Sequence, residues 1–189
     1  IEKSAFSHTV IEEIYFPQSL VELEEGWGCE AFNLKKIIIS PLNDRFVFKD
    51  DKYLVGKINQ NNDEFDYLLF VRPDIEEFSI PSNIKIISSY SFNYCKKLNK
   101  VEIDSNSQLE IIESNAFSYS YIEEIFIPSR VKQIGDYAFY KCNYLKKIDF
   151  AVNSNLETIG SYAFSYSHIE EIFIPQKVSK ICKYAFDSC

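Results

Sequence analysis

Apolar residues recur along this chain in short alternating runs that predict β-strands. The segments 75–81, 122–128 and 169–175 each open with Ile-Glu-Glu, close with Ile-Pro and lie 47 residues apart. Starts at Leu98 and Leu145 divide this period into steps of 23 or 24 residues. The third and fifth residues after each start are apolar, which is typical of a strand that buries one face. These pairs are Ile14 and Phe16, Ile37 and Ile39, Phe78 and Ile80, Val101 and Ile103, Ile125 and Ile127, Ile148 and Phe150, and Ile172 and Ile174.

One such strand in each unit predicts a repeat solenoid. A single unit would expose its apolar face, whereas stacked units bury that face in a continuous core. We therefore expect residues 1–189 to form one right-handed, β-rich solenoid with seven short parallel strand units. The chain contains no Met, and no polar capping repeat is evident at either end. We accordingly expect it to be a fragment of a longer repeat protein.

An insertion interrupts the first period. The equivalent starts Ile11 and Ile75 lie 64 residues apart, which is 17 more than the 47-residue period. The extra residues fall within 40–73 and contain three strand-like runs separated by polar turns: 46–48, 53–55 and 67–71. Short apolar runs joined by polar turns indicate a β-hairpin or meander inserted into the solenoid.

The repeat pattern L-x-x-I-x-I-P-x-x-V-x-x-I-x-x-x-A-F resembles the BspA-like class of leucine-rich repeats. Residues 131–148 follow the pattern closely, and the resemblance covers residues 4–40 and 74–189. It departs at Trp27, which we align with the Phe of other units. The resemblance implies a curved leucine-rich-repeat horseshoe with one short parallel strand per unit. The resemblance also implies that the chain comes from a surface protein, because such repeats are widespread in surface proteins of bacteria and parasitic protists.

Cysteines occupy one repeated place in the units, three residues after the motif phenylalanine. Cys95, Cys142 and Cys189 hold this place, and other units carry Thr9, Ser120 and Ser167 there, where the resembled family often has Cys. Places two units apart lie about 10 Å from each other, because adjacent strands are ~4.8 Å apart. A disulfide needs Cα atoms within about 7 Å. We therefore expect at least three free thiols, in a stack of small side chains that satisfies backbone groups within each turn.

Nothing in the sequence indicates catalysis, a metal or a cofactor. His8 and His168 lie far apart and occupy different places in the repeat. The carboxylates recur with the repeat, as scaffold features do, and the nucleophile-elbow, P-loop and dinucleotide-binding motifs are missing. Residues 59–64 could hold a calcium ion, but they lack the ligand order and glycine of an EF-hand loop, which favours a solvated turn. We expect no enzyme and no cofactor.

Charge narrows the range of partners. The chain has 20 Lys and Arg against 28 Asp and Glu, and this net charge of −8 argues against nucleic acid. No apolar run reaches the ~18 residues that cross a bilayer, so we expect no membrane insertion within this segment. Charges also alternate from unit to unit, which predicts an acid–base ladder on neighbouring strands. The ladder would run through Glu77, Lys100, Glu124, Lys147 and Glu171.

The fourth residue after each start is expected to point away from the core. This series is Tyr15, Ile38, Ser79, Glu102, Phe126, Asp149 and Phe173. In a solenoid of the resembled type, these residues lie on the concave face. Exposed aromatic residues among charges are typical of interaction surfaces, although curvature or a neighbouring domain could also cover them. The candidate partner-binding residues are Tyr15, Ile38, Glu102, Phe126, Asp149 and Phe173.

The insertion at 40–73 is a second candidate, because binding functions gather on insertions that a rigid scaffold carries. Two functions remain open. One is a non-enzymatic recognition module at the cell surface, which binds a protein or glycan through the concave face in adhesion or host contact. The alternative is an intracellular scaffold for protein–protein interaction in the cytoplasm. The odd cysteine count and the lack of N-x-Ser/Thr sequons favour the scaffold.

Overall fold

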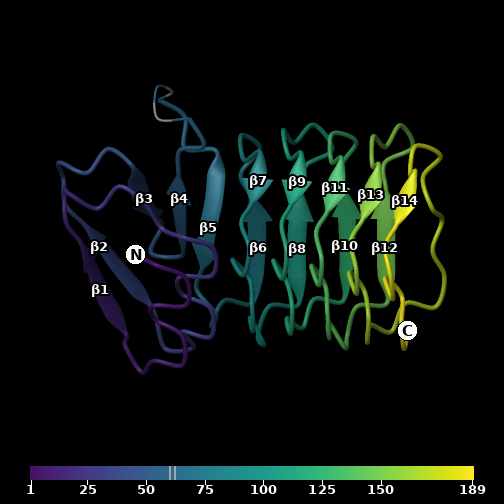
Figure 1. The fold of residues 1–189 in the computed structure, drawn as a ribbon, viewed down its shortest axis with the longest axis horizontal. Coiled ribbons are helices and arrows are strands. Elements are labelled where there is room, and N and C mark those ends of the chain that lie inside the picture. The colour runs from purple at the N-terminus through teal and green to yellow at the C-terminus, as the bar shows by residue number, and fades with distance from the viewer. Residues whose placement is uncertain (60, 62) are drawn as a thin grey trace.

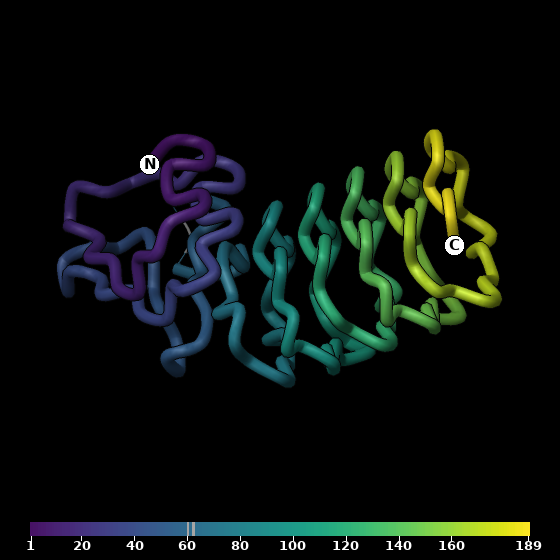
Figure 2. Tube along the Cα trace, turned by 90° about the horizontal axis from the view of Figure 1, so that it is seen from below, coloured from purple at the N-terminus to yellow at the C-terminus, as the bar shows by residue number. Residues whose placement is uncertain are grey.

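The computed structural model describes residues 1–59, 61 and 63–189. The chain winds into turns that stack side by side along one axis (Figure 1), in a gently curved row (Figure 2). Six four-residue strands carry the predicted alternation: β1 (Glu13–Phe16), β2 (Lys36–Ile39), β6 (Glu77–Ile80), β8 (Lys100–Ile103), β10 (Glu124–Ile127) and β12 (Lys147–Phe150). The solenoid of parallel strands about 23 residues apart is therefore confirmed.

The strands pair in parallel and in register. β6, β8, β10 and β12 form one sheet, and β1 and β2 form another. Each turn after the insertion also carries a two-residue strand, and these strands pair in parallel as well: β7 (Ile86–Ile87), β9 (Ile111–Ile112), β11 (Gln133–Ile134), β13 (Thr158–Ile159) and β14 (Lys180–Ile181). Equivalent residues of successive turns thus stand beside each other.

A tight-turn segment closes the third side of each turn around the Ala-Phe motif. The backbone of this segment is hydrogen-bonded to the next turn. For example, the Phe117 amide donates to the Ala138 carbonyl at 2.7 Å. Neighbouring turns approach so closely beside this segment that a Cβ on Gly135 would lie 2.6 Å from the Ser114 nitrogen. A side chain at position 135 would push these two turns apart, which explains the glycine at this place.

A column of phenylalanine rings runs through the middle of the stack. Phe92, Phe117, Phe139 and Phe164 are fully buried, and each lies parallel to the next with ring centroids 4.4–5.1 Å apart. Each ring therefore packs on the rings of the turns before and after it. The small alanine that precedes three of these rings is also buried, which leaves room for this close packing.

The seventh turn differs from the prediction. Residues 169–175 form no strand, and within the described chain no backbone hydrogen bond joins them to residues 147–150. Phe173 is 78% exposed and Ile174 is 40% exposed. This segment has a neighbouring turn on one side only, so its apolar residues lack the second contact that buries Ile125 and Ile127 in β10.

The insertion forms the predicted antiparallel β-meander. It consists of β3 (Phe46–Lys49), β4 (Tyr53–Gly56) and β5 (Tyr67–Val71), and β5 then pairs in parallel with β7. Adjacent residues of β4 enter two different hydrophobic clusters. Leu54 packs in the cluster of the first two turns, whereas Val55 packs in the cluster of the later turns. The meander is therefore a wall between two cores, buried on both faces.

Trp27 does not take the phenylalanine place that the sequence alignment gave it. The Phe6 amide donates to the Trp27 carbonyl at 3.0 Å, as the Phe117 amide donates to the Ala138 carbonyl. Trp27 therefore holds the alanine place, and Gly28 holds the phenylalanine place. The indole, 3% exposed, packs in the cluster of the first two turns in place of the ring that Gly28 lacks. Its ring neighbours are Phe6, Phe16 and Phe70.

The alternating charges stand in register but pair mainly along the strands. Register places Glu77 opposite Lys100, Lys100 opposite Glu124, and Glu124 opposite Lys147. The Lys100 ammonium, however, lies 2.7 Å from a Glu102 oxygen, and Lys147 contacts Asp149. Both partners are two residues further along the same strand and point to the same side of the sheet. Opposite charges therefore stand on neighbouring strands, but Lys100 and Lys147 form their ion pairs within their own strands.

All five cysteines are free. The Cys142 thiol donates to the Phe117 carbonyl of the preceding turn at 3.1 Å, and Cys189 does the same to Phe164 at 3.3 Å. Ser120 lies 3.4 Å from the Cys142 sulfur, so the semi-polar stack joins successive turns. Burial raises the pKa of Cys142 to about 12 and raises that of Cys95 further.

We predict that iodoacetamide at about pH 8 labels Cys189 quickly in the native chain and leaves Cys95 and Cys142 unlabelled. Only the thiolate reacts, and a pKa raised well above the solution pH keeps the two buried thiols protonated. After unfolding in urea, all five should react. Mass spectrometry of the labelled peptides measures this, and rapid native labelling of Cys142 would contradict the buried stack.

Candidate binding surface

The outward positions of the long strands form the strand face, which we define by Tyr15, Ile38, Ser79, Glu102, Phe126, Asp149 and Phe173. Register pairs these residues across neighbouring strands: Tyr15 with Ile38, Ser79 with Glu102, and Phe126 with Asp149. None of them is buried, because they alternate with the residues that fill the core.

The structure divides the predicted site residues into two groups. Tyr15 and Ile38 lie on the β1–β2 sheet, whereas Glu102, Phe126 and Asp149 lie on β8, β10 and β12. The meander stands between the two sheets (Figure 1). The later strands therefore offer the more compact candidate surface, which Phe173 of the last turn extends.

Charges on this surface are fixed by near neighbours. The Ser79 hydroxyl donates to a Glu102 oxygen at 2.9 Å, and Lys100 contacts the other oxygen. The hydrogen bond from Lys100, followed by that from Ser79, lowers the pKa of Glu102, so this carboxylate stays ionised at neutral pH. Phe126 on β10 is half-buried beside these exposed charges.

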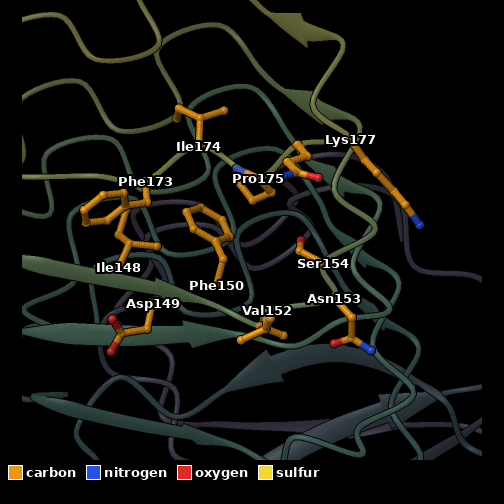
Figure 3. A pocket seen from close by; sticks show the side chains of 12 residues that line it. Ile148, Asp149, Phe150, Val152, Asn153, Ser154, Phe173, Ile174, Pro175 and Lys177 are labelled. Carbon is orange, nitrogen blue, oxygen red and sulfur yellow. The ribbon is translucent and has the colours of Figure 1, made fainter.

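An open groove of about 520 Å³ lies between β12 and the last turn. Figure 3 shows the ring of Phe150 rising from β12 toward Phe173 and Pro175 on the opposite side. Val152 and Phe173 are strongly exposed at its rim. Within the part of the chain that the structure describes, no strand pairs with the outer edge of β12.

The insertion offers little surface of its own. The residues of β4 are buried, as are the last four of β5, so their role is to separate and join the two cores. Within the Asn- and Asp-rich stretch 59–64, positions 60 and 62 lie outside the described residues. In the rest of the chain, no group of three or more His, Cys, Asp or Glu side chains could hold a metal ion.

The two histidines lie apart, as the sequence predicted. His8 is exposed, and its Nδ1 lies 2.8 Å from a Glu30 oxygen. His168 is also exposed, four residues after the motif phenylalanine Phe164. Among the described residues, neither histidine belongs to a cluster of possible metal ligands. The part of the chain that the structure describes also contains no helix long and apolar enough to cross a membrane.

Sequence reasoning missed a second, partly exposed surface on the tight-turn side, where Tyr137, Tyr166 and Tyr184 are exposed and the other rings are half-buried. We define the tyrosine surface as Tyr94, Tyr119, Tyr137, Tyr140, Tyr162, Tyr166 and Tyr184. Each ring lies within 6 Å, centroid to centroid, of another in this set. The signal was present in the sequence, because all of these tyrosines stand one or two residues from a motif phenylalanine.

The repeat and its geometry agree with a comparison against known families. Residues 1–50 and 63–189 match the family described as the BspA type leucine-rich repeat region, in six copies. The chain belongs to this family. No curated protein matches the chain.

Two solved structures share the fold of this BspA-type chain. A leucine-rich repeat protein from Eubacterium ventriosum is 25% identical with a TM-score of 0.65, over 94% of this chain and 58% of its own. The pneumococcal vaccine antigen PcpA is 21% identical with a TM-score of 0.59, over 77% of this chain and 48% of its own. The chain thus aligns with about half the length of these two proteins.

Proposed function

We propose that this BspA-type chain is a non-enzymatic recognition module that binds an extended protein segment through the strand face beside β12. The observation that carries the proposal is Phe126, an aromatic side chain that points outward from β10 and stands opposite the exposed charge of Asp149 on β12. The groove lined by Phe150 and Phe173 beside β12 adds apolar surface on which an extended peptide can place its side chains. Phe126, Glu102 and Asp149 continue this surface on neighbouring strands.

Packing between turns does not explain the outward place of Phe126, because β10 has a neighbouring strand on both sides. The core places of each turn are filled by the inward residues of the strands and by the phenylalanine column. An aromatic side chain left outside such a core is typical of the anchors of binding interfaces. The recurring carboxylates and lysines around it supply orientation more than affinity.

We propose that the module acts at a cell surface, in adhesion or host contact. Membership of the BspA type family supports this place, because repeats of this class are widespread in surface proteins. PcpA is a pneumococcal vaccine antigen, but its likeness to this chain, at 21% identity, concerns the fold alone. The alternative is an intracellular scaffold, which the five free thiols favour.

The surface location predicts that antibodies raised against residues 1–189 label intact, unpermeabilised source cells. External protease should also remove the segment under these conditions. An antibody against a cytoplasmic protein serves as the control for membrane integrity. Protection of the segment until the membrane is opened would contradict the surface role and support the intracellular scaffold.

The strand-face site predicts that a phage-displayed library of linear peptides yields binders that depend on two aromatic residues. The double variant Phe126→Ser, Phe173→Ser should bind the selected peptides at least about 30-fold more weakly, because one anchor contributes about 2 kcal/mol or more. Circular dichroism should show that the fold is kept.

Phe32→Ser is the matched control, since Phe32 is an exposed aromatic residue outside the strand face and its loss should leave binding unchanged. Peptide binding that survives the double variant, or a selection that yields no binders, would contradict the strand-face site.

A further inference from the structure

The tyrosine surface lies on the tight-turn side of the solenoid, away from the strand face. Tyr94 stacks on Tyr119 with ring centroids 4.4 Å apart, and Tyr137, Tyr162 and Tyr184 form a second stack with spacings of 4.9 and 5.0 Å. Tyr140 joins the stacks, because its ring contacts Tyr119, Tyr137 and Tyr166 at 5.4–5.8 Å. The seven rings therefore form one continuous surface over successive turns.

The fold requires a positive φ at most of these places, but it does not require a tyrosine side chain there. All except Tyr140 have a positive φ, as at Tyr119 (61°) and Tyr166 (60°). This conformation lets the amides of Tyr94, Tyr119, Tyr137, Tyr162 and Tyr166 donate to the next turn, as Tyr119 does to the Tyr140 carbonyl at 2.8 Å. Asn115 and Ser188 hold equivalent places with the same sign of φ. Asparagine adopts this conformation more readily than tyrosine, so the choice of tyrosine calls for another reason.

A lysine stands inside the row of rings. Lys141 occupies the place that Tyr94, Tyr119 and Tyr166 hold in other turns. Its ammonium nitrogen lies 5.3 Å from the ring centroids of Tyr119 and Tyr140 and 5.6 Å from that of Tyr166. None of the ion pairs found among the described residues includes Lys141.

A second lysine lies on the edge of the same surface. The Lys96 nitrogen is 5.4 Å from the Tyr94 ring centroid, two turns before Lys141. The interaction with Tyr119, then that with Tyr140, raises the pKa of Lys141, so the cation is kept at neutral pH. Burial raises the pKa of Tyr94 and Tyr162, so these phenols stay protonated hydrogen-bond donors.

We propose that the tyrosine surface binds an acidic polysaccharide that lies along the axis of the solenoid. Phenol hydroxyls both donate and accept hydrogen bonds, which suits the hydroxyl groups of sugars. The exposed rings of Tyr166 and Tyr184 offer apolar faces and edges to the C–H groups of sugar rings. Lys141 and Lys96 meet the carboxylates of the polymer through charge-assisted hydrogen bonds.

The regular spacing favours a linear polymer over a folded protein surface. Tyrosines recur at spacings of 4.4–5.0 Å within a stack of two rings and a stack of three, so a ligand with its own repeat makes similar contacts along each stack. The two lysines are separated by two turns, which suits a polymer with an acid group on alternate sugars. The site uses no residue of the strand face, so it can hold a second ligand while the strand face is occupied.

The test measures binding of hyaluronan fragments to the purified chain by biolayer interferometry. Neutral dextran and poly-glutamate serve as comparison polymers. Hyaluronan should bind, dextran and poly-glutamate should bind at least about tenfold more weakly, and added salt should weaken hyaluronan binding.

Two variants use residues that other turns already carry, which preserves the fold. Lys141→Tyr places tyrosine where Tyr119 and Tyr166 stand, and Tyr140→Ser copies Ser118 and Ser165 at the equivalent place. Each should weaken hyaluronan binding about tenfold or more, and Lys141→Tyr should also reduce the salt dependence.

Several outcomes would overturn the proposal. These are equal binding of dextran, equal binding of poly-glutamate, undetectable hyaluronan binding, or full binding by Lys141→Tyr. The double variant Phe126→Ser, Phe173→Ser should keep hyaluronan binding while it loses peptide binding. Loss of hyaluronan binding in that variant would instead place the glycan on the strand face. The two proposals can therefore fail separately: the peptide result tests the strand face, and the hyaluronan result tests the tyrosine surface.

Discussion

The structure depends on one constraint, which is that a single turn cannot bury its own apolar face. Phe139 is fully buried because Phe117 and Phe164 cover its two sides, and each of those rings depends in turn on its own neighbours. Stability is therefore approximately a sum over contacts between adjacent turns. The last turn shows the converse: with one neighbour, its strand segment separates from β12 and leaves Phe173 exposed.

The same constraint explains the insertion and leaves the outer surfaces free. A break of the 47-residue period would expose the turns on both sides, and the meander prevents this by presenting Leu54 to one core and Val55 to the other. Core places are fixed by packing, whereas outward places on the strands and tight turns vary without cost to the fold. Outward places on two sides of one scaffold can therefore carry the two binding surfaces proposed above, the strand face and the tyrosine surface.

The sequence predicted the features that repeat and failed where a feature depends on a particular neighbour. Apolar alternation at a fixed period specified the parallel strands, and three apolar runs specified the meander. The place of Trp27 was wrong by one residue, because a Trp-Gly pair fills the same space as an Ala-Phe pair and only the backbone pairing separates the two. The open edge of β12 could not be predicted, because Ile169–Pro175 has the same residues as Ile122–Pro128 and differs only in its contacts.

The coupling between turns can be measured most directly with the variant Phe139→Ala, using Trp27 as the reporter. Trp27 is the one tryptophan of the chain and lies in the other hydrophobic cluster, beyond the meander. Removal of the buried ring should cost about 3–5 kcal/mol. If the meander couples the two cores, urea unfolding followed by Trp27 fluorescence and by circular dichroism should shift together to lower urea. An unchanged Trp27 transition would show that the cores unfold independently and would contradict the account.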